Sequence, residues 1–278
     1  MGTTTEGRVL GPAPSATGHD PWAAGTAVHV LHVMGLPFSL HLRGPGARSA
    51  ETVRLVQQAH EELVRVDEVF STYRPDSDVS RIDAGLLLVS DAHPDVAEVL
   101  RLADVAQART GGRFSAHLPD GQGRTRFDPS GVVKGWAAQR VFARLMAAGD
   151  LDVCLNAGGD VVVGTRTAGR SWGVAVTDPV GGGLLGVVRL RSGAVATSGT
   201  AARGAHIRDP RDGGAPSAST QVTVRGPTLL WADVLATAAF VAGDDALALL
   251  ADHPGYEATV VSRDGRVRST AGMALEPV

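Results

Sequence analysis

The hydrophobic period of this 278-residue chain changes several times, and that irregular order most constrains the fold. Apolar residues recur at three- and four-residue spacings over residues 49–70, 95–109 and 135–148, which predicts three amphipathic helices. After residue 149, short β-rich runs separated by Gly, Asp and Pro predict mostly strands. Because no regular β-α-β alternation develops, we expect an α+β fold with a mixed, largely antiparallel sheet flanked by helices.

Four further segments complete the expected outline. Residues 27–42 are β-rich and interrupted by Gly and Pro, which predicts a strand pair or a bulged strand. Residues 231–241 and 244–251 are predicted as buried helices. The last segment, residues 257–270, is predicted as a hairpin around Asp264-Gly265.

Composition and charge exclude several classes of function. The net charge is −3 and no dense block of Lys and Arg occurs, so we expect neither nucleic acid nor an anionic membrane surface as a partner. With Cys154 alone, the chain can form neither an internal disulfide nor a zinc cluster. Residues 1–25 lack a cationic region followed by an apolar core, which predicts a disordered leader rather than a secretory signal. We therefore expect a cytoplasmic protein without stable membrane insertion, folded as a single domain over residues 26–278.

Two polar segments next to predicted helices could carry chemistry. Residues 70–80 contain Pro and Asp residues typical of a turn, with Ser80 as a candidate N-cap, although Tyr73 could instead stack on a purine or an isoalloxazine ring. Residues 127–137 form a Gly-rich loop that enters the third predicted helix, where free N–H groups and the helix dipole suit phosphate. The P-loop spacing is absent, so a plain helix-entry turn remains the alternative.

Two later segments have the same ambiguity. The segment NAGGD at residues 156–160 lies between apolar runs, so it is either a strand turn or a place where paired glycines let a ligand approach the backbone. Ser198-Gly199 is followed by His206 and by the turn sequence DPRDG. A lone histidine near a strand end is usually a polar loop residue, but one facing a nucleotide could remove a proton from an alcohol or contact phosphate.

The fifth candidate is the pair Asp233 and Thr237 on a highly apolar helical segment. Their four-residue spacing places both oxygens on one helical face. A buried carboxylate must be paired, protonated or metal-bound, and hard oxygen ligands suit magnesium. The alternative is a core Asp that is hydrogen-bonded to a neighbouring loop, and the residues favour neither reading.

Taken together and in order, these segments resemble the ApbE family of FAD:protein FMN transferases. Met34-Gly35 is similar to an early Met-Gly element, so the resemblance spans roughly residues 34–243. The other matching stretches, in chain order, are FSTYRPDSDVSRID, FDPSGVVKGWA, NAGGD, TSG with HIRDPRDGGAP, and ADVLATAAFVAG.

The resemblance implies an enzyme of the ApbE type that splits FAD and attaches its FMN half to a Ser or Thr of a partner protein, within a D-x-x-[ST]-G-A-[ST] motif, releasing AMP. Asp233 and Thr237 would bind Mg²⁺ together with the backbone carbonyl of Val133, and the ion would hold the pyrophosphate. His206 would act as the base, and Tyr73 would pack against the flavin nucleotide. Further contacts to FAD would come from Met34, Ser71, Asp128, Lys134, Asn156, Gly158, Gly159, Asp160, Ser198, Gly199 and Asp209.

The chain departs from the family pattern at three places. Residues 114–127 are shorter than the corresponding family segment, and Ser115 stands where the family has Asp. Ser130-Gly131 replaces a Gly pair, and Asp212 replaces a Thr. Two alternatives use the same residues: a metal-dependent FAD pyrophosphatase that uses water and yields FMN and AMP, and a flavin-binding protein without catalysis.

Overall fold

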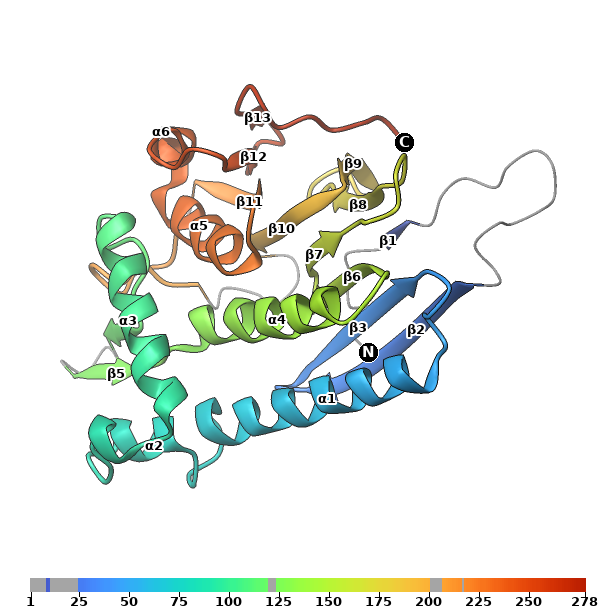
Figure 1. Ribbon diagram of the computed structural model, residues 1–278. Helices are drawn as coiled ribbons and strands as arrows, with labels where there is room; N and C mark the ends of the chain where they lie inside the picture. Colours follow the sequence, from blue (N-terminus) through green and yellow to red (C-terminus); the bar gives the residue numbers. More distant parts are fainter. Residues whose placement is uncertain (1–8, 11–24, 120–123, 201–206, 217) are drawn as a thin grey trace.

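An eight-stranded antiparallel sheet organises the protein, with helices on one face and a smaller sheet on the other (Figure 1). The structure, a computed structural model, describes residues 9–10, 25–119, 124–200, 207–216 and 218–278. In spatial order the large sheet consists of β13 (Val267–Ser269), β12 (Glu257–Ser262), β11 (Ser219–Gly226), β10 (Ser192–Gly199), β7 (Asp160–Gly164), β6 (Asp152–Ala157), β3 (Leu36–Arg43) and β2 (Thr26–Val33). The predicted α+β class is confirmed.

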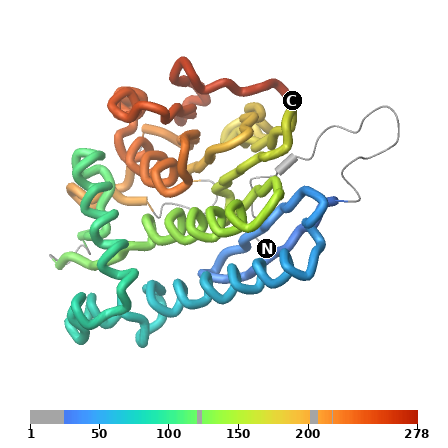
Figure 2. The backbone as a smooth tube through the Cα atoms, viewed as in Figure 1, coloured from blue at the N-terminus to red at the C-terminus, as the bar shows by residue number. Residues whose placement is uncertain are grey.

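The smaller sheet orders β1 (Val9–Leu10), β8 (Trp172–Thr177) and β9 (Leu184–Leu190). A separate hairpin pairs β4 (His117–Pro119) with β5 (Thr125–Phe127). The chain runs from β2 at one edge of the large sheet to the β12–β13 hairpin at the other edge, as Figure 2 shows. Of the predicted leader, Val9–Leu10 pairs with β8 and Gly25 precedes β2, whereas the rest lies outside the described residues.

The helices agree largely with the hydrophobic periodicity. They are α1 (Ala50–Phe70), α2 (Asp78–Asp83), η2 (Val89–Asp91), α3 (Pro94–Arg109), α4 (Ser130–Ala147), α5 (Leu229–Ala242), η3 (Gly243–Asp245) and α6 (Ala246–Ala251). Helix α4 begins five residues before the predicted start, because Ser130 and Gly131 show little hydrophobic periodicity. The N-cap of α2 is Ser77 rather than the expected Ser80, since the Ser77 hydroxyl accepts from the Ser80 N–H at 3.1 Å.

The predicted interruption in residues 27–42 is a tight hairpin turn between β2 and β3. Met34 has φ +55° and Gly35 has φ +68°, so both turn residues adopt the left-handed conformation of a type I′ turn. Met34 is the sole non-Gly residue with positive φ in the described part of the chain. The strand pair is therefore confirmed, and its turn holds a residue predicted to contact FAD.

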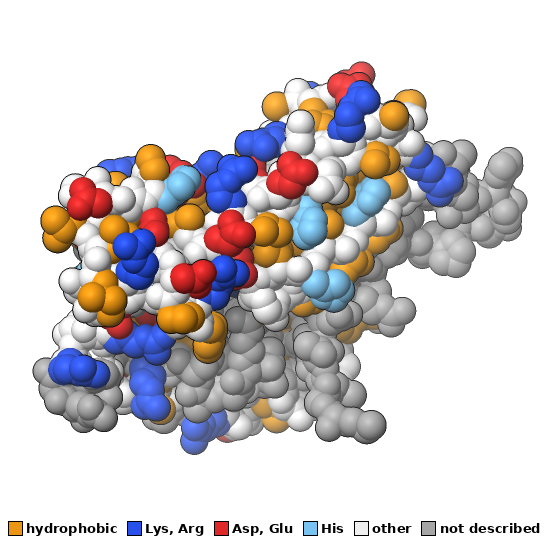
Figure 3. All heavy atoms as spheres, turned by 90° about the horizontal axis from the view of Figure 1, so that it is seen from below, with side chains coloured by type: hydrophobic (Ala, Val, Ile, Leu, Met, Phe, Trp, Pro, Cys, Tyr) orange, Lys and Arg blue, Asp and Glu red, His pale blue; other side chains and the backbone are white. Residues whose placement is uncertain are grey.

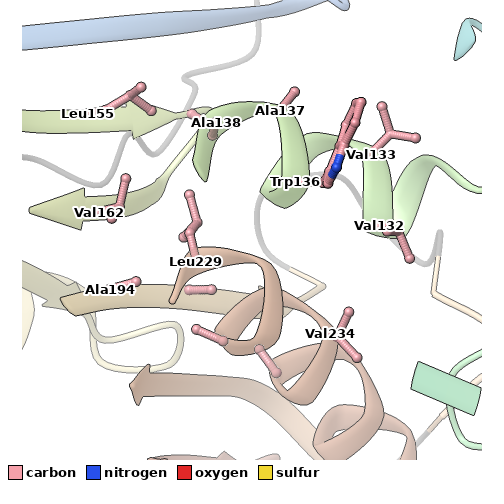
Figure 4. Packing of buried hydrophobic residues seen from close by; sticks show 14 of the residues in the cluster. Val132, Val133, Trp136, Ala137, Ala138, Leu155, Val162, Ala194, Leu229 and Val234 are labelled. Atoms are coloured by element: carbon pink, nitrogen blue, oxygen red, sulfur yellow. The ribbon is translucent and has the colours of Figure 1, made fainter. Parts of the chain in front are cut away.

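The main core lies between the large sheet and the helices. In Figure 4, Ala138 of α4 and Leu229 of α5 lie beside the sheet residue Val162, and Val132 of α4 and Val234 of α5 extend the same core away from the sheet. Burial of apolar surface of this kind is the chief stabilising term in folding. Successive strand residues point to opposite faces, so Val161 and Val163 instead join a second core against the small sheet.

One long apolar stretch lies near the C-terminal end of the described residues. Residues 229–251, which comprise α5, η3 and α6, are 23 residues long and reach a mean hydropathy of 1.7, so by length and composition alone they could cross a bilayer. In this structure α5 packs on β10, β11 and α4, as the core helix of a globular protein does.

One face of the molecule carries charges of both signs. Figure 3, which views the molecule from below, shows Lys and Arg side chains interspersed with Asp and Glu side chains and with apolar ones. This mixture agrees with the small net charge of −3. The expectation that nucleic acid is not a partner stays a prediction.

Candidate active site

Most of the predicted site residues lie at one end of the large sheet. Antiparallel pairing puts the start of β3 next to the end of β6, since Phe38 pairs with Ala157. The Gly158 N–H also donates to the Pro37 carbonyl at 3.0 Å, which ties the β6–β7 turn to the start of β3. Because β10 pairs with β7 in antiparallel register, the end of β10 at Ser198 reaches the same end of the sheet. The β2–β3 turn with Met34 also lies there.

The NAGGD segment forms the turn between β6 and β7. The Asn156 side-chain oxygen accepts from the Gly159 N–H at 2.8 Å. Gly158 has φ +60° and Gly159 has φ +108°, conformations that a side chain would strain. The two glycines are therefore required by the backbone itself, whatever ligand the turn contacts.

Asp160 follows this turn and is held by two partners from distant segments. Its Oδ1 accepts from the Thr197 N–H of β10 at 2.9 Å. Its Oδ2 forms an ion pair with Lys134 Nζ of α4. Because a buried carboxylate needs such partners, the contacts fix the orientation of Asp160. The role of the Thr197 backbone was missed, since no sequence signal marks a backbone donor.

Lys134 lies between two buried carboxylates. Its Nζ contacts Asp160 and lies 3.0 Å from Asp233 Oδ2 of α5. The three side chains are 17%, 5% and 10% exposed for Lys134, Asp160 and Asp233, so water screens their charges little. Asp233 Oδ2 makes no directed hydrogen bond within the described residues despite its closeness to the ammonium. The three charges sum to one net negative charge.

Close approach of α4 and α5 makes this ion-pair cluster possible. A Cβ added to Gly135 would lie 3.0 Å from Leu230 Cα and 3.4 Å from Asp233 Oδ2. The two helices are further joined where the Gln139 side chain accepts from the Leu229 N–H at 2.8 Å. Sequence reasoning missed this role of Gly135. The available cue was a glycine that directly follows Lys134 within a helical segment.

Thr237 lies one turn after Asp233 on α5, as its spacing predicts. Its hydroxyl lies 3.1 Å from the Ser198 hydroxyl at the end of β10. The Asp233 carboxylate and these hydroxyls are hard oxygen donors of the kind that Mg²⁺ prefers. Among the described residues, no three or more His, Cys, Asp and Glu side chains are arranged so that they could hold a metal ion, so any metal here would depend on hydroxyl and carbonyl oxygens as well.

The donor set fits a hard divalent cation. Asp233 Oδ2 is a buried oxygen that lacks a directed hydrogen bond, and Thr237 offers a second oxygen on the same helical face. Val133 lies in the first turn of α4, where a carbonyl usually accepts one helical hydrogen bond and keeps a second lone pair. Its assignment as a ligand stays a prediction.

The remaining predicted residues have local partners. Asp128 Oδ1 accepts from the Ser130 N–H at 3.1 Å, a local turn contact just before α4, whose N-cap is Pro129. The Arg211 guanidinium beside Asp209 holds the pKa of that carboxyl below its ordinary value. The Ser71 carbonyl accepts from the Ser77 hydroxyl at 2.6 Å.

Tyr73 is 95% exposed, so its ring is available for stacking. The predicted base, His206, lies outside the described residues.

The chain belongs to the ApbE family. The family's model matches residues 34–120 and 115–260. Over 158 residues the chain is 35% identical to an FAD:protein FMN transferase of Rhodobacter capsulatus, covering 53% of this chain and 30% of that protein. Over 207 residues it is 32% identical to one of Treponema pallidum (strain Nichols), covering 65% and 57% respectively. The chain thus spans less than two thirds of either relative.

Solved structures show the same fold. The ApbE protein of Thermotoga maritima superposes with a TM-score of 0.77 at 21% identity, covering 88% of this chain and 97% of that one. The apo form of the Pseudomonas stutzeri flavinyl transferase ApbE gives a TM-score of 0.74 at 24% identity, covering 89% and 96%. At such identities the likeness concerns the fold alone, and it agrees with the predicted α+β architecture.

Proposed function

We propose that this chain is an FAD:protein FMN transferase. The observation that carries the proposal is the meeting of Lys134, Asp160 and Asp233, from three separate motif segments, in one buried cluster at the end of the sheet. The names of the two curated relatives support the same activity. The expected substrates are FAD and a Ser or Thr hydroxyl of an acceptor protein.

The proposed reaction replaces one phosphorus–oxygen bond with another. The acceptor hydroxyl oxygen would bond to the phosphorus of the FMN half, while the bond from that phosphorus to the bridging oxygen breaks. AMP leaves with the bridging oxygen, and the hydroxyl proton passes to a base, for which His206 is the candidate. Phosphoryl transfer of this kind depends mainly on charge neutralisation and positioning.

Different residues of the chain would supply the charge neutralisation and the positioning. Asp233 and Thr237, with the Val133 carbonyl, would hold Mg²⁺, which supplies positive charge to the pyrophosphate when bound. Lys134 is placed to offer its ammonium to the same oxygens, because its Nζ lies 3.0 Å from Asp233 Oδ2. The exposed Tyr73 ring would stack on the flavin nucleotide, and the glycine turn at residues 158–159 would admit FAD close to the backbone.

Mass spectrometry of an acceptor peptide tests the proposal. A D-x-x-[ST]-G-A-[ST] peptide incubated with FAD, Mg²⁺ and the protein should gain one FMN. A control peptide with Ala at the acceptor position should gain none. Release of free FMN and AMP without an adduct would indicate a pyrophosphatase, and intact FAD would indicate a flavin-binding protein. Either result would overturn the transferase proposal. A cytoplasmic location is proposed with it, and fractionation of the source cells would check that.

A further inference from the structure

Lys134 is the sole lysine among the 26 Lys and Arg residues of the chain. The others of these 26 are arginines, whose planar fork suits bidentate pairing, whereas a lysine ammonium is a compact point charge. This compact charge lies between Asp160 and Asp233, both buried. A cation therefore already occupies the neighbourhood of the carboxylate proposed to bind metal.

We propose that Lys134 is a resident cation that competes with the divalent ion for Asp233. When the ion binds, the ammonium gives up Asp233 and keeps Asp160, whose other oxygen stays on the Thr197 N–H. The released ammonium is then free to face the anionic diphosphate of FAD. This inference rests on the proposed use of metal at the site.

The charges of the cluster give the competition a direction. With Lys134 in place, the cluster of its ammonium and the two carboxylates carries one net negative charge, so a divalent ion alone is attracted only weakly. After the ion enters, the net charge is positive by one unit and favours a dianionic diphosphate. Metal and FAD should therefore each strengthen the binding of the other by the same factor, as linkage requires.

Calorimetry of Mg²⁺ binding without FAD tests the competition in matched variants. Lys134→Gln removes the ammonium, and its affinity for Mg²⁺ should exceed that of the wild type by about tenfold or more. The control, Arg140→Gln, removes a positive charge from the same helix, but Arg140 pairs with Glu62 at 3.2 Å and with Asp95 at 3.1 Å. Its Mg²⁺ affinity should equal that of the wild type. Equal or weaker binding by Lys134→Gln would overturn the inference.

A second measurement needs no substitution, because a single lysine gives a single side-chain signal. In protein labelled with ¹⁵N-lysine, the Nζ resonance of Lys134 should shift when Mg²⁺ is added without FAD. It should not shift in Asp233→Asn, where the proposed ligand is lost. An unshifted resonance at Mg²⁺ concentrations up to those that support the peptide reaction would overturn the inference even if Lys134→Gln does not fold.

The two proposals fail separately. An FMN adduct on the acceptor peptide together with equal Mg²⁺ affinities for wild type and Lys134→Gln keeps the transferase and removes the competition. Tighter Mg²⁺ binding by Lys134→Gln without any adduct keeps the competition and removes the transferase.

Discussion

Gly135→Ala is the sharpest test of how α4 and α5 build the site. In an ordinary helix this change is favourable by about 1 kcal/mol, because Gly loses more conformational freedom on folding. Here the new Cβ would lie 3.0 Å from Leu230 Cα and 3.4 Å from the Leu229 carbonyl oxygen. Carbon atoms prefer separations of about 3.5–4.0 Å, so α5 must move by roughly half an ångström.

The cost of that movement should exceed the gain in helix propensity. The contacted atoms are backbone atoms, which cannot rotate away, and α5 is packed on β10 and β11. Overpacking of a core costs about 1–3 kcal/mol, so the net change in the free energy of unfolding should be a loss of up to about 2 kcal/mol. Asp233 lies on the helix that must move, and its Oδ2 is 3.4 Å from the added methyl group, so the Mg²⁺-dependent rise in Tm should shrink.

Urea denaturation followed by tryptophan fluorescence measures the change in stability. Gly149→Ala is the matched control, because a Cβ there meets nothing within 4 Å and Gly149 is not among the residues with positive φ. Its stability should stay equal or rise by about 0.4–1 kcal/mol. A gain of about 1 kcal/mol for Gly135→Ala would show that helix propensity alone governs the position and would refute the close helix contact.

Four other outcomes are expected. Asp233→Asn should keep the fold but lose turnover and most of the Mg²⁺-dependent rise in Tm with FAD; equal rises in both proteins would remove Asp233 from the ligand set. Tyr73→Ala should weaken FAD binding in calorimetry by about 1–3 kcal/mol without lowering Tm, since the ring is 95% exposed, and an unchanged Kd would leave Tyr73 a turn residue. His206→Ala should lower kcat about a hundredfold or more and FAD affinity little, whereas retained turnover would limit His206 to positioning. Burial raises the pKa of the Cys154 thiol to about 12, so iodoacetamide at pH 8 should label it in urea only, and rapid labelling of the native protein would contradict its burial.

The kinds of secondary structure were largely predictable because they depend on local periodicity and turn chemistry. The predicted helices over residues 49–70 and 95–109 correspond to α1 and α3 within one residue at each end. The start of α4 was missed, since Ser130 and Gly131 lack an apolar period. The division of the strands into two sheets was not predicted either, because β8 and β9 have the same local pattern as the strands of the large sheet.

The sequence by itself determined which residue types are present for chemistry and where each motif lies along the chain. It also limited Asp233 to being paired, protonated or metal-bound, because burial of a carboxylate leaves no other state. Only the tertiary structure showed that Asp233 has an ionic partner, because it brings Lys134 to Asp233 and also to Asp160, which lies 26 residues after Lys134 in sequence. The physical reason is that these contacts depend on how α4 and α5 pack together at Gly135 and on the register of β7 and β10, neither of which is encoded in a local pattern.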